Sequence, residues 1–140
     1  MSGWDPACLE LVRLLAGTAR GPRREGLFAL WLTVRVTQDL QLVPPPLERA
    51  HKRRVAALEH RLATLTLPPQ LRRALTAALI QLKNPKPETA ADVLSLLTAP
   101  VRDGVGTDAG DVIAAAGRAA RAKTPNPHPR PLSPSGRGER

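Results

Sequence analysis

The sequence predicts an all-α fold: a small bundle of five or six short helices around a central helical hairpin, with a disordered C-terminal tail. Apolar residues recur every three or four positions in several segments. The 140 residues include 15 prolines, most of which lie between those segments or in the tail. Only 2% of the residues are aromatic while 42% are apolar, so leucine, valine and alanine must form the core, which suits helix packing. We expect residues 1–123 to form one helical domain and residues 124–140 to form the tail.

The predicted hairpin covers residues 46–82. One apolar stripe on its first helix consists of Leu47, His51, Val55, Leu58, Leu62 and Leu65. The stripe on its second helix consists of Leu71, Leu75, Ala78, Leu79 and Leu82. Pro68 and Pro69 must separate the two helices, because proline lacks a backbone donor and pushes the preceding residue out of the helical region. Pro69 suits the first position of the second helix, and His51 is expected to be a boundary histidine at the end of the hairpin.

Two segments precede the hairpin. Asp5 as N-cap and Pro6 at the first position predict a short helix, which ends at Gly17 and has a stripe of Leu9, Val12, Leu15 and Ala16. Residues 18–25 are expected to form a basic loop. Residues 27–43 alternate like a strand at 32–37, yet no second strand-like run could pair with them, so we predict a central helix that is apolar nearly all round. Residues 44–46, three prolines, end it.

Two further helices are predicted after a turn at residues 83–87. Thr89 and Asp92 resemble a capping box that opens a short helix, and Ala99-Pro100 should close it. Residues 103–111 are expected to form a flexible acidic loop. Thr107 or Asp108 caps a final helix that runs through Ala122, with a small-residue face of Ala109, Ile113, Ala116 and Ala120.

The tail, residues 124–140, is rich in Pro, Arg, Ser and Gly and has one apolar side chain apart from proline, Leu132, so it is predicted to be disordered. Residues 126–139 (NPHPRPLSPSGRGE) resemble the peptide made when a bacterial interspersed intergenic repeat is translated through the end of a gene. That resemblance implies a bacterial source and an appended tail, and it implies nothing about residues 1–123. A second interpretation is a polyproline ligand, since Pro131 and Pro134 fit the pattern PxxP.

The sequence lacks the residue patterns of common catalytic and metal sites. Cys8 is the single cysteine, which excludes an intramolecular disulfide, and His51 and His60 point to opposite sides of their helix. The spacing of Asp103, Asp108 and Asp111 does not fit a calcium loop. The N-terminus has no secretory signal, and no apolar stretch could span a membrane. We therefore expect a cytoplasmic protein that is not an enzyme, uses no cofactor or metal and does not insert into membranes.

The net charge of +9 favours anionic partners, although the excess of arginine over lysine is also the usage expected from a GC-rich genome. Three clusters of basic residues are candidates for nucleic-acid contacts: Arg20, Arg23 and Arg24; Lys52, Arg53 and Arg54; and Arg72 with Arg73. In an antiparallel hairpin, the second and third clusters fall at opposite ends, unless residues 20–24 fold over to join one of them.

We therefore expect a non-catalytic protein–protein interaction or adaptor module with a protein partner or a second copy. The predicted interaction surface consists of residues on the central helix: Leu27, Phe28, Trp31, Leu32 and Val36. One alternative is a basic nucleic-acid-binding protein that uses the three clusters. Another is a chain with no selected function beyond folding, although the capped and striped helices favour selection for a fold.

Overall fold

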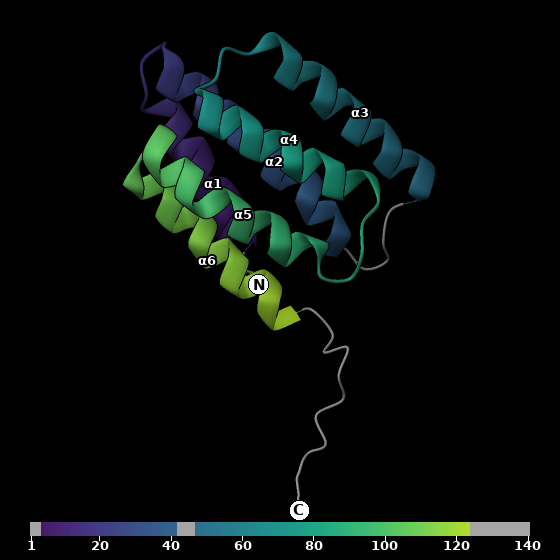
Figure 1. Cartoon of the computed structure of the whole chain (residues 1–140). Helices are drawn as coiled ribbons and strands as arrows, with labels where there is room; N and C mark the ends of the chain where they lie inside the picture. Colours follow the sequence, from purple (N-terminus) through teal and green to yellow (C-terminus); the bar gives the residue numbers. More distant parts are fainter. Residues whose placement is uncertain (1–3, 42–46, 124–140) are drawn as a thin grey trace, which may run out of the picture.

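A computed structural model describes residues 4–41 and 47–123, which form six α-helices and one short 3-10 helix with no strand among them (Figure 1). In chain order the helices are α1 (Trp4–Ala16), α2 (Pro22–Gln38), η1 (Asp39–Gln41), α3 (Glu48–Thr64), α4 (Pro69–Lys83), α5 (Thr89–Gly104) and α6 (Thr107–Lys123). The predicted all-α bundle is confirmed. The predicted disordered tail and residues 42–46 lie outside the described residues.

The central helix is α2, which contacts α1, α3, α4 and α5. Its core-facing residues include Leu27, Leu30 and Val34, which are fully buried. Thr33 and Thr37 are buried as well, and their hydroxyls donate hydrogen bonds to the carbonyls one turn earlier, Ala29 O (2.8 Å) and Thr33 O (2.7 Å). Residues 32–37 are therefore helical despite their strand-like alternation, because the helix itself satisfies the buried hydroxyls.

The predicted hairpin is formed by α3 and α4, and Pro69 is the first residue of α4 as expected. The stripes of both helices are buried, except that Leu47 is exposed and Leu65 is half-buried. Arg72 holds the two helices together at their connection, because its guanidinium donates to the carbonyls of Leu62 (3.3 Å) and Leu65 at the end of α3. In Figure 1, α3 lies at the edge of the bundle, and it packs mainly against α2 and α4.

The closest pairing of helices is between α5 and α6. Ala109, Ile113, Ala116 and Ala120 are fully buried on α6, so the predicted small-residue face is confirmed. Small side chains let the two backbones approach closely. At Gly110, even an added Cβ would lie only 2.0 Å from Cγ of Arg102 on α5.

Two expectations for α5 were wrong. Pro100 does not end the helix, which continues to Gly104, because Val101 is fully buried and continued packing outweighs the missing backbone donor. The expected loop at residues 103–111 is therefore reduced to Val105 and Gly106. The predicted capping box is absent, since the Thr89 hydroxyl accepts a hydrogen bond from the N–H of Lys86 (2.7 Å) instead.

Near the N-terminus, α1 starts at Trp4, so Asp5 lies inside the helix rather than at its N-cap. The predicted stripe of α1 was wrong for two of its leucine and valine positions: Leu9 is 65% exposed and Val12 44% exposed, while Ala7 and Leu11 are buried. Both the face with Leu9 and Val12 and the face with Ala7 and Leu11 have helical spacing. The packing of α1 against α2 and α6 buries the face with Ala7 and Leu11. The expected basic loop is also shorter than predicted, because Pro22 already begins α2.

Gly106 is predicted to be essential for the sharp turn from α5 to α6. Its φ is +144°, and a Cβ would lie 2.8 Å from Oδ1 of Asp108. We expect Gly106→Ala to lower the free energy of unfolding by about 1–3 kcal/mol in urea denaturation. Gly17→Ala is the matched control, because its Cβ would make only ordinary contacts, and it should change stability by less than about 0.5 kcal/mol. Equal stability of the two variants would contradict this account.

Candidate interaction groove

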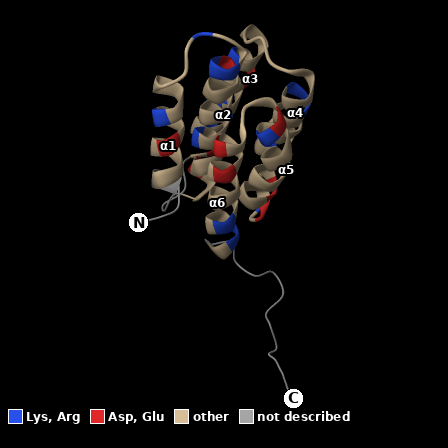
Figure 2. Cartoon of the chain, turned by 90° about the vertical axis from the view of Figure 1, so that its left-hand side faces the viewer, with Lys and Arg blue, Asp and Glu red and all other residues tan. Residues whose placement is uncertain are grey.

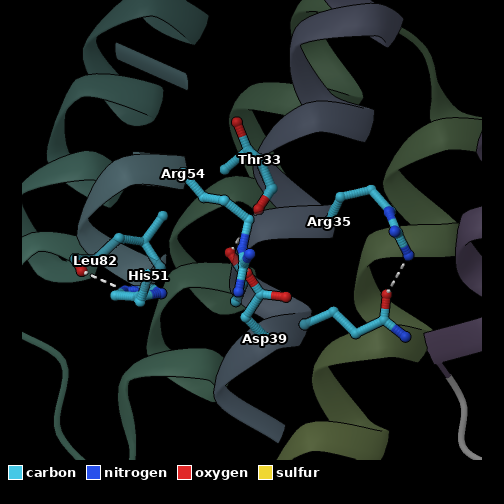
Figure 3. A network of polar contacts seen from close by, with 8 residues as sticks. Thr33, Arg35, Asp39, His51, Arg54 and Leu82 are labelled. Carbon is cyan, nitrogen blue, oxygen red and sulfur yellow. Dashed lines mark hydrogen bonds and ion pairs between the residues drawn. The ribbon is translucent and has the colours of Figure 1, made fainter. Parts of the chain in front are cut away.

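Helices α2 and α3 lie beside each other and run in opposite directions. Asp39, directly after α2, pairs with Arg54 near the start of α3, with 2.5 Å between Oδ2 and Nε (Figure 3). Phe28, early in α2, lies under the guanidinium of Arg61 near the end of α3, with 5.5 Å from Cζ to the ring centroid. These two contacts mark the two ends of a shared surface.

An open groove of about 600 Å³ follows this surface, and we call it the α2–α3 groove. Its described lining residues are Leu32 and Val36 from α2 with Arg54, Ala57, Leu58, His60, Arg61 and Thr64 from α3. The residues from α3 extend from position 54 to position 64, which is about 15 Å along the helix axis. Leu32, Val36 and Leu58 form the apolar floor of the groove, and this floor is about one helical turn long because Leu32 and Val36 are four residues apart.

The charges around the groove are mostly positive. None of the described residues that line it is Asp or Glu. Arg53 and His60 lie further out on α3, and Arg35 lies on the exposed side of α2, where its guanidinium donates to Gln38 Oε1 (3.2 Å; Figure 3). The groove therefore has a cationic edge on α3, and Arg35 of α2 lies outside it.

Two carboxylates near the ends of the groove already have partners. Asp39 is paired with Arg54, and Oε1 of Glu25 accepts a hydrogen bond from the N–H of Thr66 (2.8 Å). Neither therefore cancels the charge of Arg35, Arg53 or Arg61 through a direct contact.

The five residues of the predicted interaction surface do not all lie on one surface in the structure. Leu32 lines the groove and is half-buried, and Val36 contributes to its floor although only 8% of its surface is exposed. Phe28 and Trp31 are half-buried, and their rings stack with 6.3 Å between centroids. Leu27 was assigned wrongly to this surface. It precedes Phe28 by one residue, and a rotation of about 100° around the axis of α2 separates the two side chains, so Leu27 is completely buried in the core.

The three predicted nucleic-acid-binding clusters lie at two different ends of the bundle. Because Glu25 contacts Thr66, the start of α2 lies beside the connection between α3 and α4. The clusters at residues 20–24 and 72–73 are therefore neighbours. The third cluster, residues 52–54, lies at the opposite end, beside the end of α4. Figure 2 shows Lys and Arg spread over several helices beside Asp and Glu, rather than in one continuous stripe on this side of the molecule.

Five of the eight basic residues are held by contacts within the chain. Three form ion pairs: Arg23 with Asp108 (2.9 Å), Lys52 with Glu48 (2.9 Å) and Arg54 with Asp39 (2.5 Å). Two donate to backbone carbonyls: Arg24 to Thr18 (3.0 Å) and Arg72 to Leu62 and Leu65. Arg20, Arg53 and Arg73 are exposed and form no ion pair with another described residue.

His51 has a structural position at the other end of α3. It is 6% exposed, and its Nε2 lies 2.9 Å from the carbonyl oxygen of Leu82, near the end of α4 (Figure 3). Carbonyls in the last turn of a helix lack partners within that helix, so the imidazole supplies a donor. The expected boundary histidine of the hairpin is confirmed.

A second cavity of about 600 Å³ lies next to His51, and its other described lining residues include Asp39, Glu48, Lys52, Lys83 and Lys86. Cations and carboxylates are mixed there, and Lys52 is bound to Glu48. In the described part of the chain, no group of three or more His, Cys, Asp or Glu residues could hold a metal ion. No helix among residues 4–41 and 47–123 is long and apolar enough to cross a membrane.

The sequence did not reveal the contribution of Ala57, His60 and Arg61 to the groove. Leu58 was assigned to the hairpin seam, whereas it also lines the α2–α3 groove. The available signal was a second stripe on α3 at positions 54, 57, 61 and 64, adjacent to the seam.

The chain matches no protein-family model, and no curated protein or solved structure is significantly similar to it. Function must therefore be argued from the groove itself.

Replacing His51 tests its structural role. His51→Ala leaves the Leu82 carbonyl without its side-chain donor and opens a small cavity, so we expect a loss of about 2 kcal/mol in the free energy of unfolding. His60→Ala, on the exposed side of the same helix, should change it by less than about 0.5 kcal/mol. Urea denaturation measures the stability of both variants. Equal unfolding midpoints for His51→Ala and His60→Ala would contradict a structural role of His51.

The ion pair of Arg23 with Asp108 should give a pH-dependent contribution to stability. The Arg23 guanidinium and then the Ala109 N–H hold the pKa of the Asp108 carboxyl below its usual range. A lowered folded-state pKa stabilises the fold above the unfolded pKa of about 3.9, and this contribution is lost as the pH falls through the folded-state value. Asp108→Asn should therefore lower stability by at most about 1 kcal/mol at pH 7, since the pair is partly exposed, and the difference should shrink as the pH falls below about 3.9.

The matched background for this measurement is Arg23→Gln, in which the effect of Asp108→Asn should be smaller. A stability difference that persists unchanged at pH 2–3 would show that the Asp108 charge does not cause it.

Proposed function

We propose that this chain is a non-catalytic protein–protein interaction module that binds an α-helix of a partner protein in the α2–α3 groove. One observation carries the proposal: an open groove about 15 Å long lies between two helices, with the apolar side chains of Leu32, Val36 and Leu58 in its floor and no Asp or Glu among its described lining residues. A solvated groove of this kind leaves apolar surface in water, and covering it is favourable.

The dimensions of the groove support a helical occupant. A partner helix of about ten residues would match its length of about 15 Å. Apolar side chains at positions i, i+4 and i+7 of that helix would lie along one face and reach the floor formed by Leu32, Val36 and Leu58. Ala57 is exposed on α3, and its short side chain leaves room for a partner's side chains.

The chemistry of the groove supports a binding role rather than catalysis. Its described lining residues offer one imidazole, His60, and one hydroxyl, Thr64, without a carboxylate to orient the imidazole. No group of three or more His, Cys, Asp or Glu residues that could hold a metal ion accompanies them among the described residues.

A nucleic-acid-binding role is the second candidate, and one observation favours it: the clusters at residues 20–24 and 72–73 share one end of the bundle. Against it, Arg23, Arg24 and Arg72 already have partners within the chain. It stays a prediction that a binding measurement with duplex DNA and RNA would test.

The interaction module can be tested without a known partner. We would select binders to the full-length chain from a displayed library of helical peptides of varied charge, and measure their affinities by fluorescence anisotropy. Ala57→Gln places a longer polar side chain in the groove and should weaken the selected peptides at least about fivefold.

Ala56→Gln is the matched control, because Ala56 is exposed on the neighbouring face of α3 and lines a different cavity, between α3 and α4. It should leave affinity unchanged. If the library yields no peptide whose binding depends on Ala57, the proposed module is wrong.

A further inference from the structure

The charges around the α2–α3 groove identify the chemistry of its partner. Resting on the proposed function, we infer that the docked segment is an acidic amphipathic helix, with Asp or Glu on the side of its apolar stripe that faces α3. The argument depends on where the cations lie, on which of them are already engaged, and on the overall charge of the chain.

Cations lie along the α3 edge of the groove. On α3, Arg53 and Arg61 are exposed, and Arg54 and Arg61 line the groove wall. On α2, Arg35 is directed away from the groove, because its guanidinium donates to Gln38 Oε1, which Cys8 of α1 also contacts. A helix lying in the groove would therefore have cationic side chains along the flank that faces α3.

Two of these cations have no ion pair with a described residue. Arg53 is exposed, and Arg61 lies over the ring of Phe28. Arginine binds carboxylates through two parallel hydrogen bonds, which gives specificity as well as attraction. Only Arg54 is neutralised, by Asp39.

A second copy of the chain is a poor occupant. Each copy has a net charge of +9, so two copies repel each other, and a basic segment would place like charges along the groove. An acidic segment instead gains from the same field, which raises its association rate and rejects basic competitors.

Nucleic acid, which is also anionic, fits the groove less well. A phosphate backbone gains nothing from an apolar floor of Leu32, Val36 and Leu58. The Phe28 ring is stacked with Trp31 and covered by Arg61, so it does not offer an open face to a base. Apolar anchors flanked by carboxylates use both the floor and the cationic edge of the groove.

The experiment compares two helical peptides that share the same apolar residues at i, i+4 and i+7. One has Glu at the flanking positions and the other has Lys. We expect the Glu peptide to bind the full-length chain at least tenfold more tightly in 50 mM salt, with the difference shrinking in 500 mM salt as the charges are screened. Arg53→Glu should weaken the Glu peptide about tenfold in 50 mM salt, and still by more than about twofold in 150 mM salt, where the control is measured.

Arg73→Glu is the matched control, because Arg73 is also exposed and without an ion pair to a described residue, but lies on α4. It should change the affinity of the Glu peptide by less than about twofold at 150 mM salt, where charges further apart than about 8 Å are largely screened.

The outcomes separate this inference from the module itself. Selection of neutral or basic peptides whose binding depends on Ala57 would overturn the acidic partner and keep the interaction module. Absence of any Ala57-dependent peptide would overturn both. A dimer in light scattering that Ala57→Gln dissociates would assign the groove to a second copy, and duplex DNA binding that Ala57→Gln weakens would assign it to nucleic acid; either result would overturn the inference.

Discussion

The burial of α2 on most of its circumference constrains the rest of the structure. Four other α-helices contact it, and its two buried threonines bond to its own backbone rather than to a neighbour. A helix with this many apolar faces needs cover on several sides, so the other helices are arranged around it. The remaining exposed arc contains Phe28, Leu32 and Arg35, and the α2–α3 groove forms at Leu32 in this arc.

The groove results from a mismatch between two neighbouring helices. Because α3 buries only His51, Val55, Leu58 and Leu62, its narrow stripe covers one side of α2 and leaves the next side open. The outward positions of α3 hold arginines that suit water and cannot extend the core. An edge helix with a narrow stripe beside a central helix with a broad one therefore leaves an apolar surface beside a cationic edge.

The sequence was sufficient where local chemistry decides the structure. Proline positions placed the hairpin, and helical spacing identified the alanine face of α6, because neither depends on distant contacts. It was insufficient where packing decides. The continuation of α5 past Pro100 follows from the burial of Val101 and Val105, and the choice of face on α1 follows from α2 and α6. The groove could not be predicted for the same reason, since nothing local to Arg61 indicates that Phe28 lies beneath it.

The contact between α1 and α6 has a consequence for the order in which the bundle can be completed. Most neighbouring helices in the fold also follow each other in the sequence, and such local contacts form early. Although α1 leaves the ribosome before the other described helices, α6, one of its two main neighbours, is made after the four α-helices between them. Helix α1 is therefore among the last of these helices to be fully enclosed, and until then its buried face, with Ala7 and Leu11, lacks part of its cover.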